Sequence, residues 1–168
     1  QGICGSGLVD LLAELRRTGT MNHLGAFDDG GDRFYFAPES GMSVSRSDVS
    51  ALAQAKSANY CGQRIVLRRY GVTPESISKL YLAGGFANYI DVANAVRIGF
   101  IADVPPERVA KVGNAALEGA TIMLRSTRMR QVIEEMASRI EHVELETTPD
   151  FFDIFVDGCM FEPMGAAL

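Results

Sequence analysis

The sequence predicts an α/β fold in which a mainly parallel sheet is flanked by helices. Two short apolar runs, 80–83 and 109–112, each end in glycine and lead into a helical pattern. Helical and strand-like segments alternate along the chain, and their spacing favours parallel pairing of the two runs. With 168 residues, 47% of them hydrophobic, the chain can bury one core or form one lobe of a larger domain.

The first half of the chain predicts two helices on either side of a pair of strands. Leucines recur on one face of the first helix, and Ser45 opens the second through a capping box with Asp48. The expected elements are a helix over 7–18 closed by Gly19, a surface turn over 28–32, strands over 33–36 and 42–45, and a helix over 46–69 closed by Gly71.

The second half predicts the two apolar strands with helices after each of them. Small residues recur over 115–120, which permits close packing or close approach of a ligand. The expected elements are a strand over 80–83, a short helix over 91–98, a strand over 109–112, helices from 115 and from 126, a possible strand over 142–146 and a short helix from 149.

The two glycine corners are the strongest indication of a ligand site. Ligands of open parallel sheets bind beyond the carboxyl ends of the strands, where both corners lie. Gly84 and Gly85 have no side chains, so backbone there can press against a flat base or ribose, with Phe86 beside it. A tight strand-to-helix turn without a ligand remains the alternative.

Three further features have both a structural and a binding interpretation. Asn114 follows Gly113 in N-cap position, with ligand contact as an additional role. Lys56 shares a helix face with apolar residues, so it either snorkels to solvent or directs its cation at a phosphate. Gly5-Ser6-Gly7 offers a helix start that is favourable to anions.

The start of the chain suggests a fragment. Gln1 is not an initiator methionine, and the strand expected before Gly5-Ser6-Gly7 is missing. We therefore expect residues 1–168 to be a single C-terminal portion of a larger domain.

Composition argues against several functional classes. The formal net charge of -5 disfavours a nucleic-acid surface, and the pairs Arg16-Arg17 and Arg68-Arg69 are interpreted as cations at helix C-termini. No apolar run reaches membrane-spanning length, so we expect a cytoplasmic protein. Three scattered cysteines, Cys4, Cys61 and Cys159, predict neither a zinc site nor an iron–sulfur cluster, and neither histidine has a matched nucleophile.

Four motifs in this order resemble the reductive activators of corrinoid proteins. They are Gly2-Ile3-Cys4-Gly5-Ser6-Gly7-Leu8-Val9-Asp10, Gln54-Ala55-Lys56-Ser57-Ala58, Leu82-Ala83-Gly84-Gly85-Phe86-Ala87-Asn88-Tyr89-Ile90-Asp91 and Val112-Gly113-Asn114-Ala115-Ala116-Leu117-Glu118-Gly119-Ala120. That family belongs to the superfamily of acetate and sugar kinases, Hsp70 and actin. The resemblance runs from Gly2 to about Pro163 and rests on the order of the motifs.

The resemblance implies one lobe of an actin-like (ribonuclease H-like) ATPase that binds ATP with Mg. It places the nucleotide at Gly84, Gly85, Phe86, Asn88, Gly113, Asn114, Lys56, Gly5, Ser6 and Gly7, with no catalytic residue assigned. In this family, ATP hydrolysis accompanies reduction of cob(II)alamin to cob(I)alamin on the corrinoid protein of a methyltransferase system. The electron comes from an iron–sulfur cluster in a separate N-terminal domain, and a homodimer is possible.

The chain departs from the family pattern in two respects. It has no cysteine cluster, and the aspartate motifs that bind phosphate have no counterpart in it. We therefore expect ATPase or reductive activase activity of the longer parent and none from residues 1–168 alone. The alternatives are an activator of 2-hydroxyacyl-CoA dehydratases, a small-molecule kinase of the same superfamily, and a non-catalytic module for docking or dimerisation.

Overall fold

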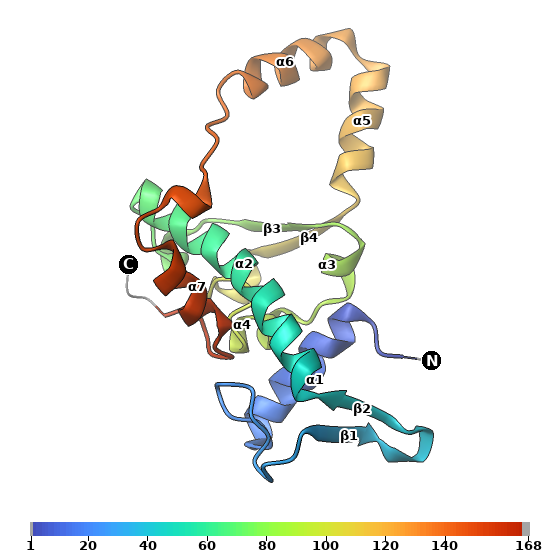
Figure 1. The fold of residues 1–168 in the computed structure, drawn as a ribbon. Coiled ribbons are helices and arrows are strands. Elements are labelled where there is room, and N and C mark those ends of the chain that lie inside the picture. Colours follow the sequence, from blue (N-terminus) through green and yellow to red (C-terminus); the bar gives the residue numbers. More distant parts are fainter. Residues whose placement is uncertain (1, 166–168) are drawn as a thin grey trace.

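A long helix, α2, organises the body of the computed structural model, and a helical arm projects from that body (Figure 1). The structure describes residues 2–165, so Gln1 lies outside the described residues. The elements are α1 Gly5–Thr18, β1 Arg33–Ala37, β2 Met42–Ser45, α2 Arg46–Tyr70, β3 Leu80–Ala83, α3 Gly85–Tyr89, α4 Val92–Arg97, β4 Val109–Gly113, α5 Ala115–Arg125, α6 Thr127–Ala137 and α7 Phe151–Cys159.

The strands form two separate pairs. β3 and β4 are parallel, with Leu80 beside Val109, as the strand spacing predicts. β1 and β2 form an antiparallel hairpin with Phe34 opposite Val44. The chain is therefore an α/β structure, and its parallel sheet has two strands within the described residues.

The helix ends follow the predicted capping residues. Ser45 and Asp48 form the capping box at the start of α2, and Gly71 closes that helix with a φ of 62°. Gly19 ends α1 in the same left-handed conformation. The paired arginines occupy the last turns of both helices, where they complement the helix dipole.

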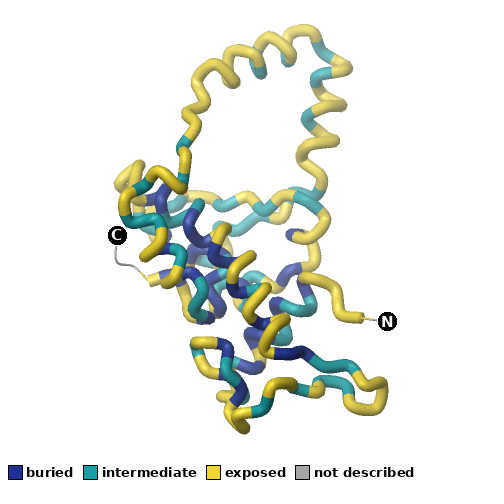
Figure 2. The backbone as a smooth tube through the Cα atoms, viewed as in Figure 1, coloured by how far each residue is buried: buried dark blue, intermediate teal, exposed yellow. Residues whose placement is uncertain are grey.

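Two hydrophobic clusters lie along α2. The first packs the N-terminal half of α2 against α1, the hairpin and α4, with Leu12, Val49 and Phe161 at its centre. The second packs the C-terminal half of α2 against α7 and residues 102–104. The buried positions of Figure 2 concentrate in this body, whereas the arm of α5 and α6 has no buried residue.

The predicted strand over 142–146 is wrong. This segment contains the 3-10 turn Leu145–Thr147, while Val143 and Leu145 pack their side chains onto the second cluster. Its alternating apolar residues are half-buried against the second cluster rather than beside another strand. A strand needs a neighbouring backbone for its hydrogen bonds, which a helix does not offer.

Candidate nucleotide-binding site

Both glycine corners adopt backbone conformations that require glycine. Gly84 has a φ of 97° between β3 and α3, and Gly113 has a φ of 64° at the end of β4. Residues that carry a side chain rarely adopt these φ values, because the Cβ atom would clash with the backbone. Gly85, in contrast, has no positive φ, and a Cβ added there would meet no heavy atom within 4 Å. Gly85 therefore faces open space that a ligand can occupy.

The two corners are joined directly. The N–H of Gly84 donates to the carbonyl of Gly113 across 2.6 Å. Gly113 also lies beside α3: a Cβ built on it would be 4.0 Å from the side-chain amide nitrogen of Asn88. This places Gly84, Gly85, Asn88 and Gly113 at one end of the parallel pair.

Asn114 has the structural role that its position predicts. Its side-chain oxygen accepts a hydrogen bond from the N–H of Leu117 at 3.0 Å, which caps the N-terminus of α5. The residue is exposed, so the cap leaves its amide group at the surface. Asn114 therefore positions the second corner through local hydrogen bonding.

The start of α1 packs against the first corner. A Cβ on Gly5 would lie 3.1 Å from the ring of Phe86, whose other neighbour is Phe100 at a centroid distance of 5.7 Å. Cys4 is the N-cap, and its thiol accepts from the N–H of Gly7 at 3.5 Å. Hydrogen bonds from Ser6 and from that N–H lower the pKa of the exposed Cys4 thiol.

Lys56 is hydrogen-bonded inside the core, which neither sequence interpretation predicted. Its residue is 0% exposed, so the ammonium does not snorkel. Nζ instead donates to the carbonyls of Gly158 at 2.5 Å and Met160 at 2.7 Å, where α7 ends. Burial lowers the pKa of Lys56 to about 8. A cation already engaged by two carbonyls inside the core is not directed at a phosphate.

Lys111 is a residue that the sequence analysis missed. Its ammonium donates to the carbonyls of Asn88 at 3.2 Å and Ile90 at 2.6 Å, so it ties β4 to the end of α3. The sequence offered one signal: a lysine within an apolar strand, just before the second glycine. Its partners could not be predicted, because they depend on the position of α3 beside β4.

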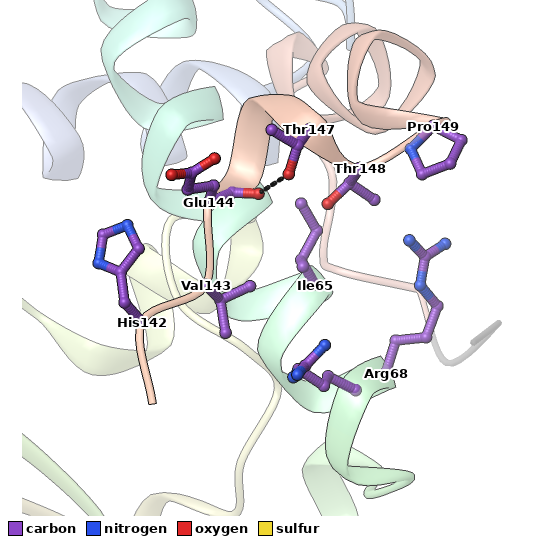
Figure 3. Close-up of a pocket in the computed structure, with 9 residues that line it drawn as sticks. Ile65, Arg68, His142, Val143, Glu144, Thr147, Thr148 and Pro149 are labelled. Atoms are coloured by element: carbon purple, nitrogen blue, oxygen red, sulfur yellow. Dashed lines mark hydrogen bonds between the residues drawn. The ribbon is translucent and has the colours of Figure 1, made fainter. Parts of the chain in front are cut away.

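One cavity lies near the glycine corners, and another lies far from them. A cavity of about 290 Å³ lies beside Phe86 and Ala87, along the edge of β3 and opposite Asn59 and Gln63. A larger cavity, of about 580 Å³, lies instead between the C-terminal end of α2 and residues 142–149 (Figure 3).

The arginines of this larger cavity are already paired. Arg68 makes a bidentate ion pair with Asp150, and Arg69 pairs with Glu141. These carboxylates offset the positive charge that would attract a phosphate, and none of the glycine corners lines the cavity. Within the described residues, no cluster of three His, Cys, Asp or Glu side chains could hold a metal ion.

The fold and the joined glycine corners define the class of protein. A strand, a pair of glycines and a short helix lie beside a second strand that leads into another helix. The family model described as the C-terminal domain of RACo, the ASKHA domain, matches residues 1–168. The chain therefore belongs to this family of actin-like domains.

Two individual relatives agree with that assignment. The chain is 30% identical over 185 residues to the "Corrinoid activation enzyme RamQ" of Eubacterium limosum, covering 96% of this chain and 31% of that protein. A solved "Reductive activator for corrinoid,iron-sulfur protein" superposes with a TM-score of 0.82 at 30% identity, covering 96% of this chain and 28% of the other. The chain thus spans under a third of either relative.

Proposed function

We propose that the chain is the adenosine-binding portion of an ATP-dependent activator that reduces cob(II)alamin to cob(I)alamin on a corrinoid protein. The observation that carries this proposal is the hydrogen bond between Gly84 and Gly113, which joins the corners while Gly85 faces open space. The relatives that match almost the whole chain are named as activators of corrinoid proteins. The corrinoid partner follows from those names.

The residues present fit one side of a nucleotide. The adenosine would lie against the bare backbone of Gly84 and Gly85, with Phe86, Asn88, Gly113 and Asn114 around it. The N–H groups at the start of α1, over Gly5-Ser6-Gly7, would face the phosphate side. Hydrolysis of ATP bound with Mg would supply the free energy for electron transfer. The residues of this chain would bind and orient the nucleotide.

We further propose that residues 1–168 form a single C-terminal portion of a larger actin-like domain. Two surfaces support this. β3 pairs only with β4 within the described residues, which leaves its other edge unpaired, and α5 and α6 have no buried residue. Sheet edges and short amphipathic helices normally need covering. The iron–sulfur cluster is assigned to another part of the parent protein.

Calorimetric titration of ATP and ADP into the longer protein tests the adenosine site. Gly85→Val fills the open space with three carbons, so we expect at least a tenfold loss of affinity, about 1.4 kcal/mol. Gly85→Ala should lose less. Lys56→Met serves as the control, because the ammonium of Lys56 lies outside the site. We expect this variant to bind ATP and ADP as tightly as the unmodified protein.

Circular dichroism first confirms that each variant is folded, so that a change in affinity reports on nucleotide binding. Unchanged affinity in Gly85→Val would remove adenosine from that corner. A loss in Lys56→Met equal to that in Gly85→Val would restore Lys56 as a phosphate ligand. Appearance of cob(I)alamin absorbance, on mixing with ATP, a reduced electron donor and a cob(II)alamin protein, tests the activity itself.

A further inference from the structure

The aromatic ring of Phe86, beside the first glycine corner, is held between two other parts of the chain. On one side lies the start of α1, where a Cβ built on Gly5 would be 3.1 Å from the ring. On the other side lies the ring of Phe100, at a centroid distance of 5.7 Å and a tilt of 49°. Because Phe86 directly follows Gly85, the position of its ring sets how the first corner meets the start of α1.

Phe100 follows a helix end that fixes its backbone. Gly99 comes just after α4 in the left-handed conformation, with a φ of 69°, and the N–H of Phe100 donates back to the carbonyl of Ala95 at 2.8 Å. This is the hydrogen-bonding pattern of a Schellman motif. A Cβ on Gly99 would also collide with the carbonyl oxygen of Glu162. The turn therefore needs glycine, and it directs the chain toward α2.

Two amide side chains of α2 hold the backbone of this segment. The amide nitrogen of Asn59 donates to the carbonyl of Phe100 at 2.5 Å, and that of Gln63 donates to the same carbonyl at 3.1 Å. The amide oxygen of Gln63 accepts from the N–H of Ala102 at 2.8 Å. Residues four apart share a helix face, and a carbonyl oxygen has two lone pairs, so both donors can bind it. Phe100 is thereby fastened to a helix that is capped at both ends.

Gln63 acts on the protein rather than directly on a ligand. Its amide nitrogen also donates to the carbonyl of Asn59 at 3.3 Å, so both of its hydrogens have acceptors, while its oxygen is bound to Ala102. The cavity beside Phe86 is lined by Gln63. A side chain whose polar atoms are already bound can shape such a cavity through the groups that it holds.

We propose that Asn59 and Gln63 are positioning residues for the nucleotide site. By holding the carbonyl of Phe100, they keep its ring against Phe86 and keep the first corner in the shape that receives adenosine. This inference rests on the proposed function, because it takes Phe86 to lie beside the bound nucleoside. Its physical basis is preorganisation: a corner that is already braced loses less freedom when the ligand binds.

A double-mutant cycle in the longer protein tests the proposal, with ATP affinity measured by calorimetry. Gln63→Glu keeps the size of the side chain but turns a carboxylate oxygen toward the carbonyl, and Phe100→Leu removes the ring. We expect about fivefold weaker binding in each, and again about fivefold rather than ~25-fold in the double variant, because both act through one ring. Gln54→Glu is the matched control: it adds the same charge on an exposed position of α2 that lines a different cavity, and its affinity should stay within about twofold.

Each result supports or overturns the proposal once circular dichroism shows that the variants are folded. Unchanged affinity in Gln63→Glu or in Phe100→Leu overturns it. Losses that multiply in the double variant also overturn it, because two residues that merely stabilise the fold act separately. Equal weakening by Gln54→Glu would assign the loss to charge alone. If Gln63→Glu does not fold, Asn59→Ala takes its place in the cycle, since it removes the shorter bond from an exposed position.

The nucleotide titrations distinguish failure of this proposal from failure of the proposed function. Loss of affinity in Gly85→Val with none in Gln63→Glu overturns the positioning role and leaves the adenosine site in place. Absence of ATP binding by the unmodified protein, or unchanged affinity in Gly85→Val, overturns the adenosine site and the positioning role with it.

Discussion

The α2–α7 pair and the α5–α6 pair each pack two helices together, and each includes a helical glycine, Gly158 in α7 and Gly119 in α5, yet the first glycine is buried and the second is not. α7 crosses α2 so closely that a Cβ on Gly158 would lie 2.5 Å from the hydroxyl oxygen of Ser57. A Cβ on Gly119 of α5 would meet nothing within 4 Å. A glycine in a helix therefore marks close packing only where tertiary contacts occupy the space of its missing side chain.

Polar bonds also differ between the two pairs. Across α2 and α7, the hydroxyl of Ser57 donates to the carbonyl of Phe155 at 2.5 Å, and Lys56 binds two carbonyls at the end of α7. Across α5 and α6, the corresponding bonds are local to the bend and exposed. The first set links residues about a hundred positions apart, whereas the second links near neighbours.

The largest expected effect is that of Gly158→Ala. The added methyl group would contact Ser57 and Tyr60 and push α7 away from α2. We expect the free energy of unfolding to fall by about 3 kcal/mol, as overpacked cores do. Urea unfolding measures it.

Gly119→Ala is the matched control for Gly158→Ala. Its methyl group enters open space within a helix, so α5 should gain about 0.5–1 kcal/mol from helix propensity alone. Equal effects of the two substitutions would show that the difference between the helix pairs is not one of packing.

The next largest expected effect is a pH dependence of the free energy of unfolding, which the buried Lys56 causes. Its pKa is lowered by burial to about 8 from 10.5 in the unfolded chain. Between these values the unfolded chain binds more protons, so the free energy of unfolding rises with pH, by up to ~1.4 kcal/mol per unit. Below about pH 8 this group contributes no slope.

Lys56→Met removes this contribution. Urea unfolding of both proteins at several pH values from about 7 to about 10 should show that the unmodified protein gains stability relative to the variant. A constant difference across this range would contradict a depressed pKa. The thiol of Cys61 and the hydroxyl of Tyr60, both with pKa values raised by burial, remain in both proteins and cancel.

A smaller, local effect is expected for Arg130→Ala at the bend between α5 and α6, where Arg130 donates to the carbonyls of Met123 and Leu124. The substitution leaves the last carbonyls of α5 without the guanidinium, which should cost about 1 kcal/mol locally. Because the arm has no buried residue, amide hydrogen exchange over 123–137 is the suitable measurement. Arg128→Ala, which removes no such bond, should leave exchange nearly unchanged, and slowed exchange in Arg130→Ala would refute the cap.

The described part of the chain has no helix that is long and apolar enough to cross a membrane. Its three cysteines are free, with Cys4 exposed and Cys61 buried.

Local chemistry made several features predictable from the sequence. The capping box of Ser45 and Asp48, the left-handed glycines and the N-cap of Asn114 were all predicted, because each depends on residues within a few positions. The parallel pairing of β3 and β4 followed from the spacing of strands and helices. The joined position of the two corners follows from that pairing.

Features that depend on distant partners could not be predicted. The apolar spacing around Lys56 correctly placed it on the buried face of α2, but its acceptors lie 102 and 104 residues away. Residues 142–146 alternate like a strand, and only the position of α2 against them made strand pairing impossible. Lys111 likewise gained its role from α3 beside it.

The sequence by itself determined the α/β class and the helix ends, including the closing glycines of α1 and α2, because steric and hydrogen-bonding preferences act between neighbours. Only the tertiary structure decided that Lys56 donates to carbonyls at the end of α7, that Gly158 is packed while Gly119 is open, and that the bend between α5 and α6 is exposed. The physical reason is that burial and ion pairing depend on which distant backbone lies nearby.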